Sequence, residues 1–199
     1  MRRWLKPLVG IVAFVPAGVT AFRFFTDRLG ANPIAEALNE AGKWTLILLL
    51  ASLACAPAKV LFDWNWPLKI RRLLGLCAFA YASMHFSMYL VVDQFFAWDE
   101  IWKDIATRKF ITVGFAAFVL LIPLAVTSTN KMVKRLGFPR WKRLHRLAYL
   151  AGVLGIVHFL WRVKSDYREP LIYGGVLALL LAVRVVDFLR PPRSRPAAG

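Results

Sequence analysis

The stretch "WKRLHRLAYLAGVLGIVHFLW" at residues 141–161 decides how the chain is interpreted. It joins a cluster of basic residues to an apolar run long enough to cross much of a lipid bilayer. It also carries two of the three histidines in the chain, His145 and His158. Ionisable side chains are costly inside lipid, so a histidine in such a run is a candidate functional residue. The alternative is a hydrogen bond between neighbouring helices.

The composition is that of an integral membrane protein. Of the 199 residues 59% are apolar and 14% aromatic, and the mean hydropathy is +0.54. A helical crossing needs roughly 17 to 25 mostly apolar residues. Six such runs are found, at 8–25, 44–62, 72–92, 110–128, 145–162 and 170–189. The sequence therefore predicts an all-α, polytopic membrane protein, a bundle of six transmembrane helices surrounded by membrane lipid.

The first apolar run is predicted to be a retained span. The basic start "MRRWLK" is typical of a signal peptide, but no small-x-small cleavage pattern follows cleanly and Pro16 interrupts the run. The short connections leave no room for a separate soluble domain. We expect residues 1–190 to form one membrane domain and residues 191–199 to form a flexible cytoplasmic tail.

The net charge of +16 is distributed unevenly along the chain. One predicted side of the bundle comprises the N-terminus, 59–72, 131–146 and everything from Arg184 onward. That side holds eighteen of the 27 Lys and Arg residues but only two acidic residues. The other side is close to neutral. Cytoplasmic segments carry the excess of Lys and Arg, so both termini are predicted to be cytoplasmic, and the charge does not indicate nucleic acid.

Two histidines are predicted to lie at the same depth. His85 follows Arg72 by thirteen residues, about 20 Å along a helix, and His158 follows Arg146 by twelve, about 18 Å. Both helices run outward from the basic side. Two neutral imidazoles from different helices can bind a haem iron axially, one on each face. Zinc is a weaker candidate because it usually takes four ligands. A histidine-lined path for protons or metal ions is the rival interpretation.

Aromatic side chains are expected to flank this level. Phe79, Tyr81, Phe86, Tyr89 and Phe159 offer flat apolar area near the predicted depth of the two histidines. Helix packing is the alternative explanation for aromatic residues at helical spacing.

His145 is predicted to lie near the inner surface, opposite Arg71 and Arg72 rather than opposite another histidine. On one ideal helix His145 and His158 would point about 220° apart. With Arg71, Arg72 and Trp141, His145 is a candidate site for a second haem lacking a histidine on its other face, or for a flavin or quinone. The alternative is a polar residue solvated at the membrane interface.

Two surface segments are candidates for docking. Arg140, Lys142 and Arg143 are positioned to contact an electron donor or a cofactor phosphate, although they also serve as a plain topology signal. On the other side, the segment 93–109 mixes acidic residues with Phe95, Phe96, Trp98 and Trp102. It is either part of a docking surface or an interfacial amphipathic segment.

The sequence contains no recognisable machinery for making or breaking covalent bonds. No Ser/His/Asp constellation, phosphate-cradling glycine loop, paired carboxylates or dinucleotide fingerprint is found. The chain is therefore not expected to carry out bond-making chemistry on its own.

Several longer segments carry a family resemblance. They are "RRLLGLCAFAYASMHFSMYLVVD" at 71–93, "KDIATRKFITVG" at 103–114, "PLAVTSTNKMVKRLG" at 123–137 and the stretch at 141–161. With these segments the chain resembles the haem-binding membrane subunits of periplasmic protein-methionine-sulfoxide reductase systems, within the ferric-reductase-like transmembrane family.

The resemblance implies a b-type haem protein of the bacterial inner membrane. It would pass electrons to a periplasmic molybdopterin-containing methionine sulfoxide reductase subunit that repairs oxidised proteins. The implied electron sources are the quinone pool or a cytosolic flavin reductase, and FMN is an implied second cofactor. The oxidase members of the wider family carry a C-terminal flavin and NADPH domain that is not found here, so we expect another molecule to supply the electrons.

The resemblance also implies roles for individual residues. His85 and His158 match the outer haem pair of the wider family, and His145 matches its inner histidine on the fifth span. Arg71 or Arg72 stands where that family has its other inner histidine. One haem b is therefore expected, and a second remains an open alternative.

Overall fold

The computed structural model describes residues 4–189, and every regular element in that range is helical. The elements are α1 Leu5–Phe25, α2 Pro33–Phe62, α3 Pro67–Met88, the π-helical turn η1 Tyr89–Asp93, α4 Trp98–Thr107, α5 Lys109–Val126, α6 Asn130–Leu136, α7 Phe138–Leu144, α8 Leu147–Arg162 and α9 Arg168–Leu189. Six helical segments in this range are long and apolar enough to cross a membrane. The predicted all-α bundle of six spans is confirmed, while the tail predicted at 191–199 lies outside the described residues.

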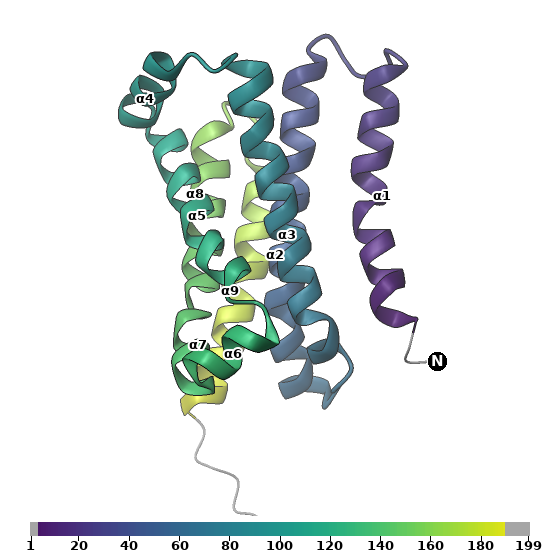
Figure 1. Cartoon of the computed structure of the whole chain (residues 1–199), viewed down its shortest axis with the longest axis vertical. Helices are drawn as coiled ribbons and strands as arrows, with labels where there is room; N and C mark the ends of the chain where they lie inside the picture. The colour runs from purple at the N-terminus through teal and green to yellow at the C-terminus, as the bar shows by residue number, and fades with distance from the viewer. Residues whose placement is uncertain (1–3, 190–199) are drawn as a thin grey trace, which may run out of the picture.

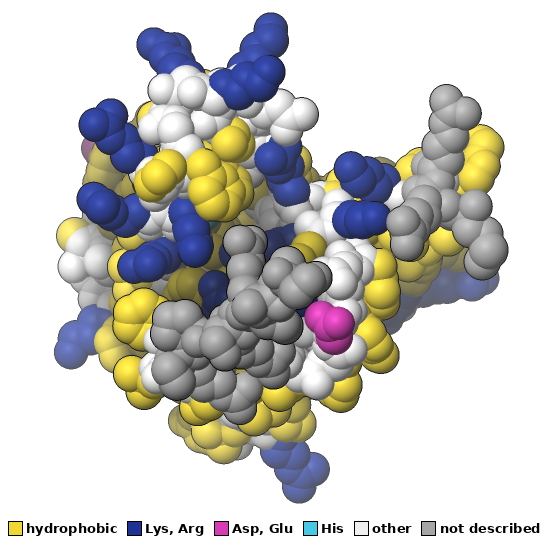
Figure 2. Space-filling model, turned by 90° about the horizontal axis from the view of Figure 1, so that it is seen from below, with side chains coloured by type: hydrophobic (Ala, Val, Ile, Leu, Met, Phe, Trp, Pro, Cys, Tyr) yellow, Lys and Arg dark blue, Asp and Glu magenta, His cyan; other side chains and the backbone are white. Residues whose placement is uncertain are grey.

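The helices run up and down between the two ends of the bundle (Figure 1). The start of α1, the α2–α3 connection, α6, α7 and the end of α9 share one end, which we call the basic end. The short helix α4 lies at the opposite end. Figure 2 looks onto the basic end and shows a surface rich in Lys and Arg. The segments that the charge pattern grouped together thus lie together in space.

Helix α2 is the centre of the bundle. It packs against α1, α3, α8 and α9, and a second close pair is formed by α5 and α8. One core cluster joins Leu49 of α2, Ala78 of α3, Leu121 of α5 and Ala151 of α8. These contacts place α2, α3, α5 and α8 around a common interior.

Helix α2 begins at Pro33, eleven residues before the predicted start of this span. The Asn32 side chain accepts a hydrogen bond from a backbone N–H of the first turn, and proline is favoured at the first helical position. The extra turns carry Glu36, Glu40 and Lys43, which hid the helix from a hydropathy criterion. The start predicted for the second span, residue 44, was therefore wrong.

The two connections singled out in the sequence are also partly helical. Helix α4 buries Ile101 and Asp104 and exposes Trp98 and Trp102, the pattern expected of an amphipathic segment at a membrane surface. The basic segment 131–146 forms the short helices α6 and α7 and ends with a turn.

A tyrosine attaches α1 to the bundle. The Tyr81 hydroxyl accepts a hydrogen bond from the Ala17 N–H at 3.1 Å and donates one to the Ala13 carbonyl at 2.9 Å. Ala13 and Ala17 are four residues apart, so the hydroxyl is inserted into the hydrogen-bond ladder of α1. The Phe14 ring stacks on the Tyr81 ring at 5.5 Å between centroids. Tyr81 therefore faces α1, and the expectation that it flanks a cofactor was wrong.

We expect Tyr81→Phe to loosen α1. The variant keeps the stacked ring but removes both hydrogen bonds, each worth about 0.5–1.5 kcal/mol. Thermal denaturation in detergent should show a lower midpoint for Tyr81→Phe than for Tyr167→Phe, which alters an exposed tyrosine. Equal midpoints for the two variants would show that the hydroxyl does not stabilise the position of α1.

Candidate functional site

A cavity of about 500 Å³ lies between α2, α3, α5 and α8 in the half of the bundle that carries α4. Both His85 and His158 line it. Its walls are largely apolar and include Leu46, Leu49, Phe86, Phe115, Phe118 and Leu121. Its rim is charged and includes Glu40, Lys43, Arg108, Arg162 and Glu169. The cavity thus offers an apolar interior and a polar edge.

Each cavity histidine is held by a backbone carbonyl of a neighbouring helix. His85 Nδ1 lies 2.8 Å from the Leu38 oxygen, and His158 Nδ1 lies 2.7 Å from the Phe110 oxygen. A carbonyl only accepts hydrogen bonds, so each Nδ1 must carry the hydrogen. In a neutral imidazole the Nε2 atom then keeps its lone pair, and neither Nε2 has a hydrogen-bond partner among residues 4–189. Both rings therefore present a nitrogen suited to binding a metal.

The separation of the two rings fits one metal ion between them. Their centroids are 6.2 Å apart and their planes are inclined at 82°. With metal–nitrogen bonds of about 2 Å on each side, two imidazoles on one metal have ring centres about 6 Å apart. Within the described residues no group of three or more His, Cys, Asp or Glu side chains is arranged to hold a metal. The pair therefore suits a metal whose other ligands belong to a cofactor.

Two glycines make room for the histidines. A Cβ added to Gly42 of α2 would lie 3.1 Å from His85 Cε1, and one added to Gly114 of α5 would lie 2.6 Å from His158 Nδ1. Sequence reasoning missed both glycines and both carbonyls. The only signal in the sequence is a glycine four residues after each carbonyl, and it acquires meaning only when the helix pairing is known.

The rim of the cavity has unused polar groups. The Asn39 Oδ1 atom is buried and has no hydrogen-bond partner within the described part of the chain. Arg162 lines the rim, and no ion pair or hydrogen bond of its side chain is found between residues 4 and 189. Lys43 is already paired with Glu169 at 3.0 Å. An available cation beside an apolar cavity fits a flat apolar ligand with carboxyl groups at one edge, which is the character of haem.

The predicted aromatic flank is partly confirmed. Phe86, Tyr89 and Phe159 line the cavity, and Phe86 stacks on Phe118 at 4.8 Å between centroids. Phe79 is not among the lining residues and stacks on the ring of Phe118, at 5.9 Å between centroids. Depth alone predicted this group, whereas the face of each helix decides which rings reach the cavity.

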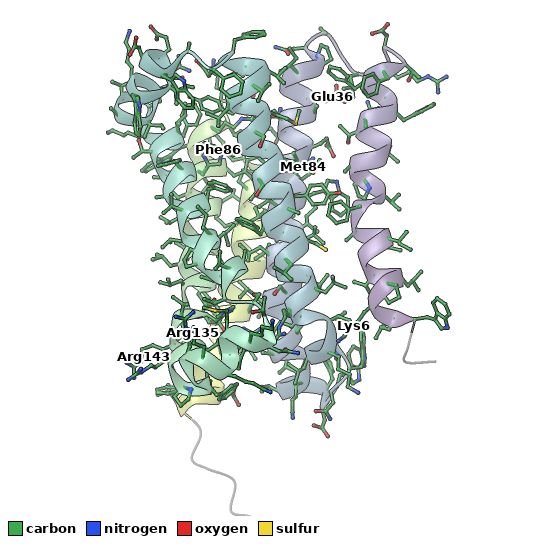
Figure 3. All side chains as sticks on the ribbon, in the orientation of Figure 1. Lys6, Glu36, Met84, Phe86, Arg135 and Arg143 are labelled. Atoms are coloured by element: carbon green, nitrogen blue, oxygen red, sulfur yellow. The ribbon has the colours of Figure 1, made fainter. Side chains whose placement is uncertain are left out.

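Helix α3 presents different faces to two cavities (Figure 3). Met84 lies on the side toward α1 and Phe86 on the side toward α5. Met84 and Tyr81 line a second, smaller apolar cavity of about 250 Å³ beside α1. His85 lies between these faces and lines the larger cavity.

His145 lies apart from both cavities, at the break between α7 and α8. Its Nε2 is 3.1 Å from Thr127 Oγ1. The Thr127 hydroxyl is also 2.6 Å from the Pro123 carbonyl, to which it must donate. His145 Nε2–H therefore donates to Thr127. The expectation of one continuous helix through 145 and 158 was wrong, because α8 begins at Leu147.

The other residues predicted to accompany His145 gather around it at the basic end. The Trp141 ring centroid is 4.1 Å from that of His145, and its indole N–H donates to the Thr127 carbonyl at 3.0 Å. Arg71 and Arg72 are close enough for their charges to act on the imidazole. Arg72 also donates a hydrogen bond to Asn130 Oδ1 at 2.6 Å.

The three cations predicted to meet a donor are on the surface of α7. Arg140, Lys142 and Arg143 are all exposed, and none forms an ion pair with residues 4–189. Figure 3 shows Arg143 at the basic end, on the outside of the bundle. They lie in the same short helix as Trp141, so the exposed charges and the His145 cluster are neighbours.

Comparison with known proteins assigns the family. The family described as "Ferric reductase like transmembrane component" matches residues 41–156. The chain belongs to the ferric-reductase-like transmembrane family.

Curated relatives include proteins named "Protein-methionine-sulfoxide reductase heme-binding subunit MsrQ". The one from Rhodospirillum rubrum is 52% identical, over 94% of this chain and 89% of its own length. Those from Herminiimonas arsenicoxydans and Deinococcus radiodurans are 51% and 46% identical, over 91% and 92% of this chain. The resemblance seen in the sequence is confirmed.

Proposed function

We propose that this chain is a haem-binding membrane subunit that carries electrons across the bilayer to a methionine sulfoxide reductase. The observation that carries the proposal is the pairing of His85 and His158. Their free Nε2 atoms, their ring separation of 6.2 Å and the surrounding apolar cavity suit a haem iron ligated on both faces. The names of the relatives, each a heme-binding subunit of such a reductase, support the same conclusion.

Residues of the chain supply the binding site for one haem b. His85 and His158 would hold the iron through their Nε2 atoms, and Arg162 would receive the carboxyl groups at the rim. Bound haem supplies reversible one-electron redox chemistry. The chain holds each imidazole in the Nδ1–H form, keeps water away with apolar walls, and places the site far from the basic end.

The charge distribution supports an orientation. We propose that the basic end is cytoplasmic and that the membrane is the bacterial inner membrane, since Lys and Arg are enriched on cytoplasmic segments. Both termini are then cytoplasmic and the haem cavity lies toward the periplasm. An acceptor on that side fits the proposed molybdopterin-containing reductase subunit, which would perform the catalytic step.

The basic end is the proposed entry point for electrons. A quinol or a flavin, FMN included, would meet the cluster of His145, Trp141, Arg71 and Arg72. The hydrogen bond from His145 Nε2–H to Thr127 favours an organising role for His145 over ligation of a second haem. Arg140, Lys142 and Arg143 would attract an anionic donor to this surface.

The rival function, a histidine-lined path for protons or metal ions, has less support. Such a path needs exchangeable groups spaced along the membrane normal. Two of the three histidines lie side by side, and their Nδ1 hydrogens are held by helix carbonyls.

We expect His158→Ala or His85→Ala to abolish the low-spin b-type absorption bands, because each removes one axial nitrogen. The reduced-minus-oxidised spectrum of the purified protein measures this directly. Trp161→Phe, on the exposed side of α8, is the control and should keep the bands. Unchanged bands in both histidine variants would reject the ligand assignment.

We expect His145→Ala to leave the number of haems per chain unchanged, because His145 lies outside the cavity and donates through Nε2 to Thr127. Haem quantified against protein in the purified variant measures this ratio. A ratio that falls by half relative to the unaltered protein would identify His145 as the ligand of a second haem.

We expect the triple charge reversal Arg140→Glu, Lys142→Glu and Arg143→Glu to slow reduction by an anionic donor roughly tenfold at low salt. Stopped-flow reduction of the bound haem by reduced FMN measures the rate. The effect should fade as salt rises. Lys164→Glu, near the opposite end, is the control. Equal reduction rates for the two variants at low salt would show that these three cations only set the orientation of the chain in the membrane.

A further inference from the structure

We propose that Gly42 and Gly114 are positioning residues for the two cavity histidines. Together with the carbonyls of Leu38 and Phe110 they form two equivalent seats, one on α2 and one on α5. Each seat fixes the tautomer and the rotation of one imidazole, and so sets the properties of the metal centre between them. The inference rests on the proposed haem function and adds residues that lie outside the ligand set.

The two seats have the same construction. Gly42 follows Leu38 by four residues in α2, and Gly114 follows Phe110 by four residues in α5. In an α-helix the side chain at the later of these positions stands beside the carbonyl at the earlier one. The carbonyl has two lone pairs, so it can serve the helix ladder and an outside donor together. Without a Cβ at the later position, an imidazole can approach that carbonyl.

The contacts show how closely each ring uses the space. At Gly42 an added Cβ would lie 3.1 Å from Cε1 and 3.2 Å from Nδ1 of His85. At Gly114 it would lie 2.6 Å from Nδ1 and 2.8 Å from Cε1 of His158. In both seats the Nδ1–Cε1 edge of the ring rests on the glycine. An alanine would press on the edge that makes the carbonyl hydrogen bond.

Close packing of helices alone does not explain these contacts. Gly152 of α8 also lies at a packed interface, yet an added Cβ would meet its nearest neighbours at 3.6 Å, an ordinary contact distance. Gly155, which lines the same cavity, would likewise meet Leu46 at 3.6 Å. Among the helical glycines between residues 4 and 189, an added Cβ comes within 3.2 Å of another side chain only at Gly42 and Gly114.

The seats also determine the angle between the rings. A ring N–H donates in the plane of its ring, so each carbonyl fixes the plane of its own imidazole. The result is an interplanar angle of 82°. Near-perpendicular axial imidazoles give low-spin ferric haem a strongly anisotropic electron paramagnetic resonance spectrum with a large highest g value. The Nδ1 hydrogen bonds also raise ligand basicity, which helps to set the reduction potential.

The test compares Gly114→Ala, Gly42→Ala and the control Gly152→Ala in the purified full-length protein. Loss of an outer partner of a metal ligand typically costs about 10- to 100-fold in affinity. For Gly114→Ala we expect haem affinity to fall by that amount. For Gly42→Ala we expect a smaller fall in haem affinity, together with a lower highest g value and a shifted midpoint potential. Gly152→Ala should retain the spectrum and potential of the unaltered protein.

The outcomes separate this inference from the function on which it rests. Unaltered protein without low-spin haem overturns the proposed function. Low-spin haem in the unaltered protein, with the same g values and potential in both seat variants, overturns the seats alone. If Gly114→Ala does not assemble, Gly42→Ala decides: a changed g value or potential supports the seats, and an unchanged spectrum overturns them.

Discussion

The structure depends on how a buried imidazole N–H is satisfied inside lipid. No water reaches the hydrocarbon core, so a polar hydrogen there must find a protein partner. His85 and His158 find theirs in helix carbonyls at 2.8 and 2.7 Å. Because each carbonyl accepts a hydrogen bond from Nδ1–H, the Nε2 atom of each ring keeps its lone pair in the cavity. The same bond that makes the histidine tolerable in the membrane also prepares it as a metal ligand.

A similar division between polar and apolar groups shapes the cavity and the surface. Aromatic and aliphatic side chains line the interior of the cavity, and charged residues such as Lys43, Glu169 and Arg162 are confined to its rim. At the other end of the molecule, the cations of α6 and α7 cover a surface with few acids (Figure 2). The two ends therefore differ in charge, which would give the proposed electron transfer a direction.

Much of the fold followed from the sequence because hydropathy and length define spans. The matching depth of His85 and His158 also followed, since residue counts along parallel helices convert directly into height. The side of each helix on which a residue lies could not be predicted from the sequence. Tyr81 shares that level but inserts its hydroxyl into α1, a contact that depends on how α1 packs. Gly42 and Gly114 were missed for the same reason, because their role exists only between helices.

The predicted helix boundaries were wrong where polar residues extend a helix beyond its apolar run. The first turns of α2 carry Glu36, Glu40 and Lys43, so hydropathy placed its start near residue 44. Leu38 and Gly42 belong to those turns. The segment that the sequence assigned to a connection thus supplies the partner of His85.

Distance along the bundle constrains the choice of electron donor. The levels of His145 and His158 differ by roughly 20 Å, from the thirteen residues that separate them and the rise of a helix. Electron tunnelling weakens steeply with distance, so a water-soluble flavin at the basic end would reduce a haem in the cavity slowly unless a further cofactor lay near His145. A lipid-soluble quinol can approach from within the bilayer at a greater depth and needs no such intermediate. The count of cofactors and the identity of the donor are therefore one question, and the haem content of the protein constrains both.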